Sequence, residues 1–268
     1  DHRDLHSFPT RRSSDLGYLN PNEYVIKLKG EEIARGEILV DYYLALNPGN
    51  ITGEVDGIDT IEPAYGIPSR WITKDKKELA EIYGYTVIDP LSVLVTHLSE
   101  IVKAHAHELL SRQDVNQLIG NLKKINESLV EEVVPSMVSY GNIQKILGNL
   151  LREGIPIKDM ETIIETIGDY GASVKDTEIM TEYIRQSLKR TITRKWADGG
   201  QIKVITLDTD VEKLIINSIN KNEKNSYLSI VPEIIQKIVG ELLEQIKNLK
   251  AEMNVPIVLT SPFVRVYF

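Results

Sequence analysis

Three histidines, His97, His105 and His107, fall within eleven residues of one predicted helix and are the first candidates for metal or acid–base chemistry. Imidazole is a common zinc ligand, but ligands from a single helix must project from the same face. At about 100° per residue, His105 joins the apolar side of the helix while His107 points almost the opposite way. No two of these three histidines are four residues apart, and HExxH does not occur. We therefore expect no metal site, a buried His105 with a hydrogen-bond partner, and two surface histidines.

The other reactive residue types form no recognisable catalytic arrangement. Cysteine is absent, which excludes disulfides, thiolate metal ligands and a cysteine nucleophile. The sequence contains no Walker A motif, no GxGxxG and no GxSxG, and no pair of carboxylates belongs to a known catalytic scaffold. We expect a protein that is not an enzyme and binds no cofactor. A deep polar pocket that joined carboxylates to His97 or His105 would reopen the enzyme interpretation.

A short stretch, residues 61–72, is the best candidate for binding. Two prolines, a glycine and two large aromatics within twelve residues suit neither a regular helix nor a central strand. Pro63 has a fixed φ and pushes Glu62 toward extended geometry, so a stiff loop presents Tyr65. Two interpretations stay open from these residues alone. Tyr65 and Trp71 either fill a small core or contact a partner.

A helix, Gly-Ile-Pro-Ile, helix pattern around Gly154 is similar to a helix-turn-helix, and the next predicted helix carries a basic stripe of Arg185, Lys189, Arg190, Arg194 and Lys195. The candidate second helix of that motif is acidic, however, with Asp159, Glu161, Glu165 and Asp169. The net charge of −8 also opposes phosphate tracking and leaves no polybasic surface for anionic lipid. Nucleic-acid binding is therefore a distant alternative.

The elements that would position these residues predict several small domains in an ordinary soluble globular chain, with 42% hydrophobic and 26% charged residues. Alternation around Gly30 predicts a β-hairpin within residues 22–39. Asp89 and Pro90 are a helix start, and one face of that helix is apolar. The residues of that face are Leu91, Leu94, Val95, Leu98, Ile101, Val102 and Leu109.

Helical periodicity continues through the middle of the chain. Ser111 and Asp114 have the spacing of a capping box, and further helices are predicted at 142–153, 158–168 and 177–196. Predicted inward residues are Val115, Leu118, Ile119, Leu122 and Ile125, then Ile143, Ile146, Leu147 and Leu150. After Gly199, the order strand, helix, helix, strand indicates an α/β unit.

The first sixteen residues differ from the rest because they show no apolar periodicity. They resemble, over their whole length, the translation of a sequencing-library adapter, so we expect them to be an artefact without fold. The natural sequence is then expected to begin at Gly17 in mid-gene, and the last predicted strand suggests a cut C-terminus. No apolar run approaches the roughly 18 to 20 residues of a membrane helix.

Motifs spread in order over residues 17–268 resemble the cytoplasmic part of the flagellar type III secretion export-gate proteins, the FHIPEP family. They are Pro21-Asn22-Glu23-Tyr24-Val25-Ile26, Ala34-Arg35-Gly36-Glu37, Leu44-Ala45-Leu46-Asn47-Pro48-Gly49, Glu62-Pro63-Ala64-Tyr65-Gly66, Ala104-His105-Ala106-His107-Glu108-Leu109-Leu110-Ser111-Arg112-Gln113, Gln144-Lys145-Ile146-Leu147-Gly148-Asn149-Leu150-Leu151-Arg152-Glu153-Gly154 and Lys203-Val204-Ile205-Thr206-Leu207-Asp208. Together they are far more specific than any single motif.

The resemblance implies a mixed α+β and α/β fold of several subdomains. A truncated α/β subdomain is interrupted by a small inserted one, and a helical subdomain and a truncated C-terminal α/β subdomain follow. The boundaries are 17–40 with 90–109, then 41–89, 110–189 and 190–268.

The resemblance also implies a function. Such proteins form a nine-membered ring below a membrane-embedded N-terminal half, where flagellar export chaperones carrying late substrates dock before secretion driven by proton motive force. The docking residues would be Glu62, Pro63, Tyr65 and Thr96. Other members can carry Asp and Phe in place of Glu62 and Tyr65, so chaperone choice could differ. Trp71 is assigned to packing.

Implied partners are the chaperones, further copies of the chain and other export-apparatus proteins, at the cytoplasmic face of the bacterial inner membrane. Contact with the membrane would come only through the missing N-terminal half, and no nucleic acid is expected. The export gates of virulence type III secretion systems are the nearest alternative.

Overall fold

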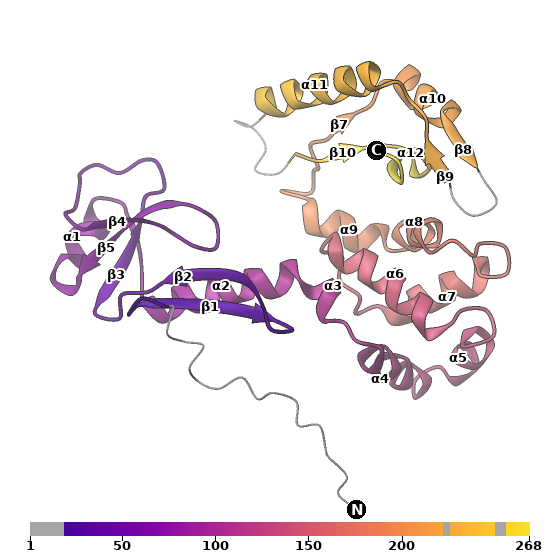
Figure 1. Cartoon of the computed structure of the whole chain (residues 1–268), viewed down its shortest axis with the longest axis horizontal. Helices are drawn as coiled ribbons and strands as arrows, with labels where there is room; N and C mark the ends of the chain where they lie inside the picture. Colours follow the sequence, from indigo (N-terminus) through magenta and orange to yellow (C-terminus); the bar gives the residue numbers. More distant parts are fainter. Residues whose placement is uncertain (1–18, 222–225, 250–255) are drawn as a thin grey trace, which may run out of the picture. The chain divides into compact units, whose positions relative to one another are not determined.

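The computed structural model describes residues 19–221, 226–249 and 256–268. The chain divides into two compact units, Asp1–His105 and Ala106–Phe268, hereafter the first and second units (Figure 1). Both contain helices and small sheets, so the expected mixed α and β architecture is confirmed. The division into four subdomains stays a prediction, and the proposed artefact at residues 1–16 lies outside the described part of the chain.

The first unit begins with the predicted hairpin. Strands β1 (Glu23–Leu28) and β2 (Glu31–Glu37) pair antiparallel, with Tyr24 opposite Gly36. The turn between them contains Lys29 and Gly30, both with positive φ. Glycine adopts this backbone geometry without steric cost, which is why the sequence reverses direction here.

A four-stranded antiparallel sheet forms the rest of the β structure in this unit, in the order β4-β5-β3-β6. Its strands are β3 (Tyr42–Leu46), β4 (Ile58–Ile61), β5 (Pro68–Thr73) and β6 (Thr86–Ile88). Leu44 and Trp71 are paired neighbours on one face and pack with Val93 of helix α2 (Pro90–Ala104). The other face packs against Ala80 of helix α1 (Lys77–Ile82), which follows a short 3-10 turn, η2 (Lys74–Lys76). Trp71 is 2% exposed, which confirms its assignment to packing.

Helix α2 begins as predicted but buries a different face. The Asp89 carboxylate accepts the backbone N–H of Ser92, and Pro90 occupies the first turn. The buried residues are Val93 and His97, because these two face the sheet and the hairpin. Much of the predicted inward face is exposed instead, namely Leu91, Val95, Leu98, Val102 and Leu109. The predicted single helix also ends at Ala104, and residues 106–109 form the separate helix α3 (Ala106–Leu109).

The second unit opens with a helical bundle that follows α3. Its helices are α4 (Arg112–Lys123), α5 (Glu127–Val133), α6 (Tyr140–Arg152), α7 (Met160–Tyr170), α8 (Thr177–Ser187) and α9 (Lys189–Trp196). Both halves of the predicted Ser111 and Asp114 capping box are present. The predicted helix 177–196 breaks at Leu188 into α8 and α9, and α5 was not predicted.

One apolar core holds this bundle together. It includes Ile143, Ile146, Leu147 and Leu150 of α6, all predicted inward and all buried. Isoleucines of α7 and α8 complete it from the opposite side. Val115, Ile119 and Leu122 are also buried as predicted, whereas Ile125 lies after the end of α4 and is exposed.

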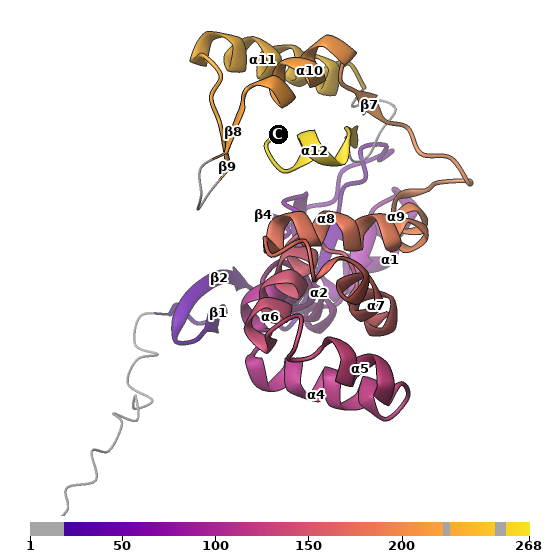
Figure 2. The ribbon, with the colours of Figure 1, turned by 90° about the vertical axis from the view of Figure 1, so that its right-hand side faces the viewer.

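The C-terminal segment, residues 197–268, packs more sparsely. It contains β7 (Ile205–Thr206), α10 (Thr209–Asn217), β8 (Ile219–Lys221), β9 (Ser226–Leu228), α11 (Pro232–Leu249), β10 (Val258–Leu259) and α12 (Pro262–Arg265). Strands β7 and β10 are parallel neighbours, as the predicted α/β order requires, and the hairpin β8–β9 and helix α12 were not predicted. Figure 2 shows α12 on the side of α10 and α11 that faces α8. Across the described ranges, no helix is long and apolar enough to cross a membrane.

Candidate docking site

The loop after β4 is closed by its own acidic residue. The Glu62 side chain is 3% exposed, and its carboxylate accepts the backbone N–H groups of Ala64 (3.0 Å) and Tyr65 (2.7 Å). The backbone N–H of Gly66 donates to the Glu62 carbonyl at 2.9 Å, and Gly66 has a φ of +69°. Glu62 therefore acts as an internal cap that fixes the loop. A carboxylate at the rim of a binding pocket would instead be open to the partner.

Tyr65 is the exposed part of this loop. Its side chain is 62% exposed, and its hydroxyl donates to Oε1 of Glu100 on α2 at 3.2 Å. The same oxygen accepts from Nζ of Lys103 at 2.7 Å. The hydrogen bond to Glu100 raises the pKa of the Tyr65 hydroxyl. The Tyr65 ring is thus held at its tip while much of its surface stays open to a partner.

Thr96 reaches the same neighbourhood from α2. It lies one helical turn before Glu100, so the two side chains share a face of the helix. Thr96 and Pro63 are both half-buried. The four residues predicted from the resemblance thus come from one loop and one helix of the first unit, joined by the bond between Tyr65 and Glu100.

The histidine expectation is wrong for both His97 and His105. His97, predicted at the surface, is 3% exposed, whereas His105 is only half-buried. The Nδ1 atom of His97 lies 2.7 Å from the hydroxyl of Tyr24 on β1. The described residues include no group of three or more His, Asp or Glu side chains that could hold a metal ion.

The Tyr24 and His97 rings meet edge to face, with centroids 5.7 Å apart. Burial, and secondarily the charge of Glu62, raises the pKa of Tyr24 to about 12. Burial lowers the pKa of His97, although Glu62 acts in the opposite direction. Sequence reasoning missed this pair because its members are 73 positions apart. Only the hairpin register, with Gly36 opposite Tyr24, could have suggested that the ring needs space there.

The second unit contains a cavity that the sequence did not predict. It has a volume of about 650 Å³ and lies between α8, the end of α10 with β8, and α12. Its lining is mostly apolar, and includes Ile179, Tyr183, Ile216, Phe263 and Val266. Among the lining side chains that the structure describes, Glu182 supplies one carboxylate, and no histidine is present.

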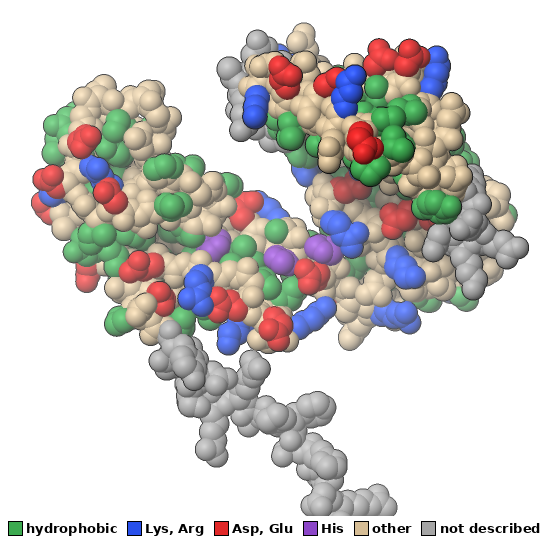
Figure 3. Space-filling model, turned by 45° about the horizontal axis from the view of Figure 1, so that its top comes forward, with side chains coloured by type: hydrophobic (Ala, Val, Ile, Leu, Met, Phe, Trp, Pro, Cys, Tyr) green, Lys and Arg blue, Asp and Glu red, His purple; other side chains and the backbone are tan. Residues whose placement is uncertain are grey.

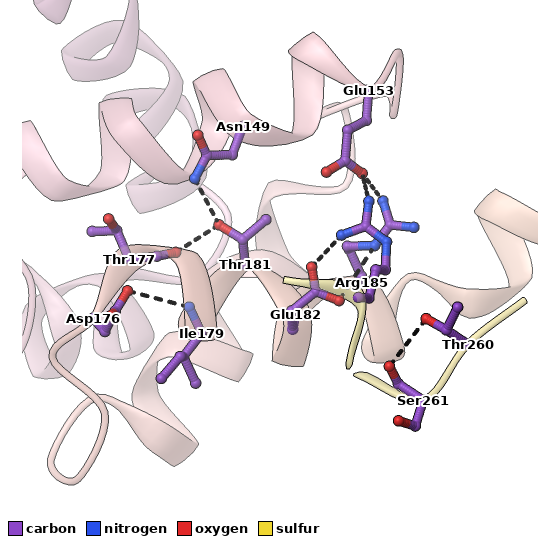
Figure 4. A network of polar contacts seen from close by, with 11 residues as sticks. Asn149, Glu153, Asp176, Thr177, Ile179, Thr181, Glu182, Arg185, Thr260 and Ser261 are labelled. Atoms are coloured by element: carbon purple, nitrogen blue, oxygen red, sulfur yellow. Dashed lines mark hydrogen bonds and ion pairs between the residues drawn. The ribbon is translucent and has the colours of Figure 1, made fainter. Parts of the chain in front are cut away.

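An ion network beside this cavity joins α12 to the bundle, and Figure 4 shows Glu153, Glu182 and Arg185 of this network. Arg185 and Arg265 both pair with Glu153 at the end of α6, and Arg265 also pairs with Glu182. Burial, followed by the charge of Arg265, lowers the pKa of Arg185 to about 10, and burial raises the pKa of Glu182. The Arg185 guanidinium is therefore already paired with carboxylates. It does not belong to an exposed basic stripe that could bind phosphates.

Comparison with solved structures defines the class of protein. The chain is similar to the Chlamydia pneumoniae CdsV protein, with 30% identity and a TM-score of 0.79 over 94% of this chain and 73% of that one. It shares its fold with the nonameric EscV cytosolic domain from the type III secretion system, at 22% identity and a TM-score of 0.65, over 92% of this chain and 80% of that one. The fold is thus one found in cytosolic domains of type III secretion proteins.

The sequence comparison identifies the family. The model of the FHIPEP family matches residues 7–268. The flagellar biosynthesis protein FlhA of Bacillus subtilis is 43% identical over 260 residues, which are 97% of this chain and 38% of that protein. The chain belongs to the FHIPEP family, and it spans less than half the length of this relative. The predicted resemblance is confirmed.

Proposed function

We propose that the chain is the cytoplasmic part of a flagellar protein-export gate, and that it docks export chaperones carrying late substrates. Family membership and the 43% identity to a flagellar biosynthesis protein support the flagellar role. The observation that carries the docking role is the exposure of Tyr65 on a loop fixed by Glu62 and bonded to α2. Tyr65 is an aromatic side chain that is held in place, partly exposed, and near a threonine and a proline. Such a side chain is typical of an interface anchor.

The same proposal includes assembly and location. The chain forms a nonameric ring with copies of itself, as the EscV cytosolic domain does. It also contacts other export-apparatus proteins. It lies at the cytoplasmic face of the inner membrane and is attached through a membrane-embedded N-terminal half. Secretion is driven by proton motive force, and the chain itself catalyses no reaction. The alternative, a virulence export gate, is less well supported, because the relative named for flagellar biosynthesis is 43% identical, whereas the EscV cytosolic domain from the type III secretion system is 22% identical.

Titration calorimetry with purified Bacillus subtilis chaperone–substrate complexes tests the docking role. Tyr65→Ala removes the exposed ring and should weaken binding by about 2 kcal/mol or more, as loss of an interface anchor does. Tyr227→Ala removes a tyrosine that is 48% exposed on β9 in the second unit and should leave binding unchanged. Equal affinities for wild type and a folded Tyr65→Ala variant would refute this docking site.

A further inference from the structure

The buried histidine beside the docking loop has no part in the function proposed so far. His97 is 3% exposed and lies within hydrogen-bond distance of Tyr24. Through these two side chains, α2 and the β1–β2 hairpin meet directly. Burial of a histidine costs more free energy than burial of an apolar side chain, so the presence of His97 at this position requires an explanation.

The direction of the hydrogen bond between Tyr24 and His97 depends on which nitrogen of the imidazole carries the proton. The Tyr24 hydroxyl keeps its proton at neutral pH, because burial disfavours the phenolate. The hydroxyl lies 2.7 Å from Nδ1 of His97, and we take the hydroxyl as the donor and an unprotonated Nδ1 as the acceptor. The imidazole is then neutral with its proton on Nε2. Protonation of His97 would place a second N–H on Nδ1 and remove the acceptor that Tyr24 uses.

The second strand of the hairpin holds Tyr24 in place. Gly36 is directly opposite Tyr24 in the register. A Cβ atom at Gly36 would lie 2.5 Å from Cζ of Tyr24, and closer still to its hydroxyl oxygen. Real Cβ contacts are never so short, so only glycine leaves room for the ring. The hairpin is thus shaped to direct the Tyr24 hydroxyl at His97.

Glu62 connects the pair to the docking loop. Its negative charge acts on both Tyr24 and His97, while its two carboxylate oxygens hold the amides of Ala64 and Tyr65. The other elements packed here add little charge: β2 presents Gly36, and Glu100 on α2 is engaged by Lys103 and Tyr65. Glu62 is therefore the carboxylate toward which a charged His97 would be drawn.

We propose that Tyr24 and His97 are positioning residues for the docking loop, and that protonation of His97 releases the loop. A neutral His97 leaves Glu62 free to cap the loop amides. A protonated His97 loses the bond from Tyr24 and competes for the Glu62 carboxylate, which loosens the hold on Tyr65. The inference rests on the proposed function only in taking this loop as the docking surface.

The sign of the pH dependence follows from linkage. Burial lowers the pKa of His97 in the folded state below its unfolded value, so the unfolded chain binds more protons between the two values. The stabilisation from neutral His97 is complete above the unfolded pKa, near 6.5, and declines as the pH falls toward the folded value. The order of the loop should decline over the same range.

Hydrogen exchange measured by NMR on the full chain, with no partner present, tests the proposal. After correction for the intrinsic exchange rate, the Ala64 and Tyr65 amides of the wild type should lose about tenfold in protection between about pH 7.5 and 5.5. His97→Asn offers an acceptor that does not titrate, and should abolish this transition. Tyr24→Phe removes the donor to neutral His97, so the transition should move to higher pH.

The proposal is overturned by an unchanged transition in His97→Asn, and equally by imidazole nitrogen shifts showing Nδ1 of His97 protonated at about pH 7.5. If His97→Asn does not fold, Gly36→Ala tests the same bond, because its methyl group displaces the Tyr24 hydroxyl. It should shift the midpoint as Tyr24→Phe does, and an unshifted midpoint overturns the proposal. Because no chaperone is present, failure of the docking function, tested by Tyr65→Ala, is distinguished from failure of this inference.

Discussion

The helical bundle and the C-terminal segment, both in the second unit, differ greatly in how many hydrophobic residues they bury. Nineteen buried hydrophobic residues between Val115 and Leu188 form one continuous core. In the C-terminal segment, the buried hydrophobic residues among those described are Ile215 and Val264. The bundle therefore contains its own source of stability, whereas the C-terminal segment depends on surfaces outside its own small core.

The C-terminal segment also exposes hydrophobic residues on helix α11. Ile235, Val239 and Leu243 follow one another at intervals of four along α11, and each is more than 40% exposed. Figure 3 shows hydrophobic side chains gathered at the surface of this segment among charged groups. An amphipathic helix normally buries such a stripe, whereas these three residues of α11 are exposed.

Truncation of a bundle core residue should give the largest effect. Leu147→Ala on α6 removes a side chain with no exposed surface from the centre of the core. It should lower the free energy of unfolding by about 2 to 5 kcal/mol, from lost burial plus a cavity. Urea denaturation followed by circular dichroism measures it. A loss below about 1 kcal/mol would show that the bundle is not the main stabilising core.

An intermediate effect is expected from the ion network that attaches α12 to the bundle. Arg265→Gln leaves Arg185 alone between Glu153 and Glu182. Because these groups are partly exposed, we expect a loss of only about 1 to 2 kcal/mol, confined to the attachment of α12. Hydrogen exchange near residues 258–267 should accelerate while α6 and α7 stay protected.

Arg194→Gln on α9 is the matched control for that prediction. Arg194 is an exposed arginine of the neighbouring helix and should not alter exchange at α12. If both variants accelerate exchange equally, the network does not hold α12. If Arg265→Gln unfolds the bundle as well, the two regions are one cooperative unit and the contrast drawn above is wrong.

The sequence predicted these regions best where the structure depends on residues that are close together in the chain. The start of α4 was predicted because a capping box involves only Ser111 and Asp114. The buried face of α6 was predicted because a helix inside a bundle buries its full apolar stripe. In α2, by contrast, periodicity selected the wrong face, because the sheet and hairpin that cover Val93 and His97 are distant in sequence.

The same distinction applies to the candidate site. The prolines and the glycine of residues 61–72 predicted a stiff loop without a central strand, and this prediction is wrong for residues 68–72. They belong to β5, an inner strand that pairs with both β3 and β4, where Pro68 occupies the first position. The loop itself is confined to residues 62–67, and Tyr65 within it is exposed as predicted. The inward role of Glu62 depends on where its carboxylate turns within the loop, which composition cannot specify. The contact of Tyr24 with His97 depends on strand register and on packing between elements, neither of which is encoded in spacing along the chain.

The smallest effect is expected on the exposed face of α11, where Val239→Ser exchanges an apolar for a polar side chain that is already 45% in solvent. The free energy of unfolding should change by less than about 0.5 kcal/mol, because little burial is lost. The same change should reduce self-association, since exposed apolar stripes favour non-specific contact. Urea midpoints and light scattering measure the two quantities. A loss above about 1 kcal/mol would show that this face is covered in solution, and that the C-terminal segment is packed more like the bundle than its described contacts indicate.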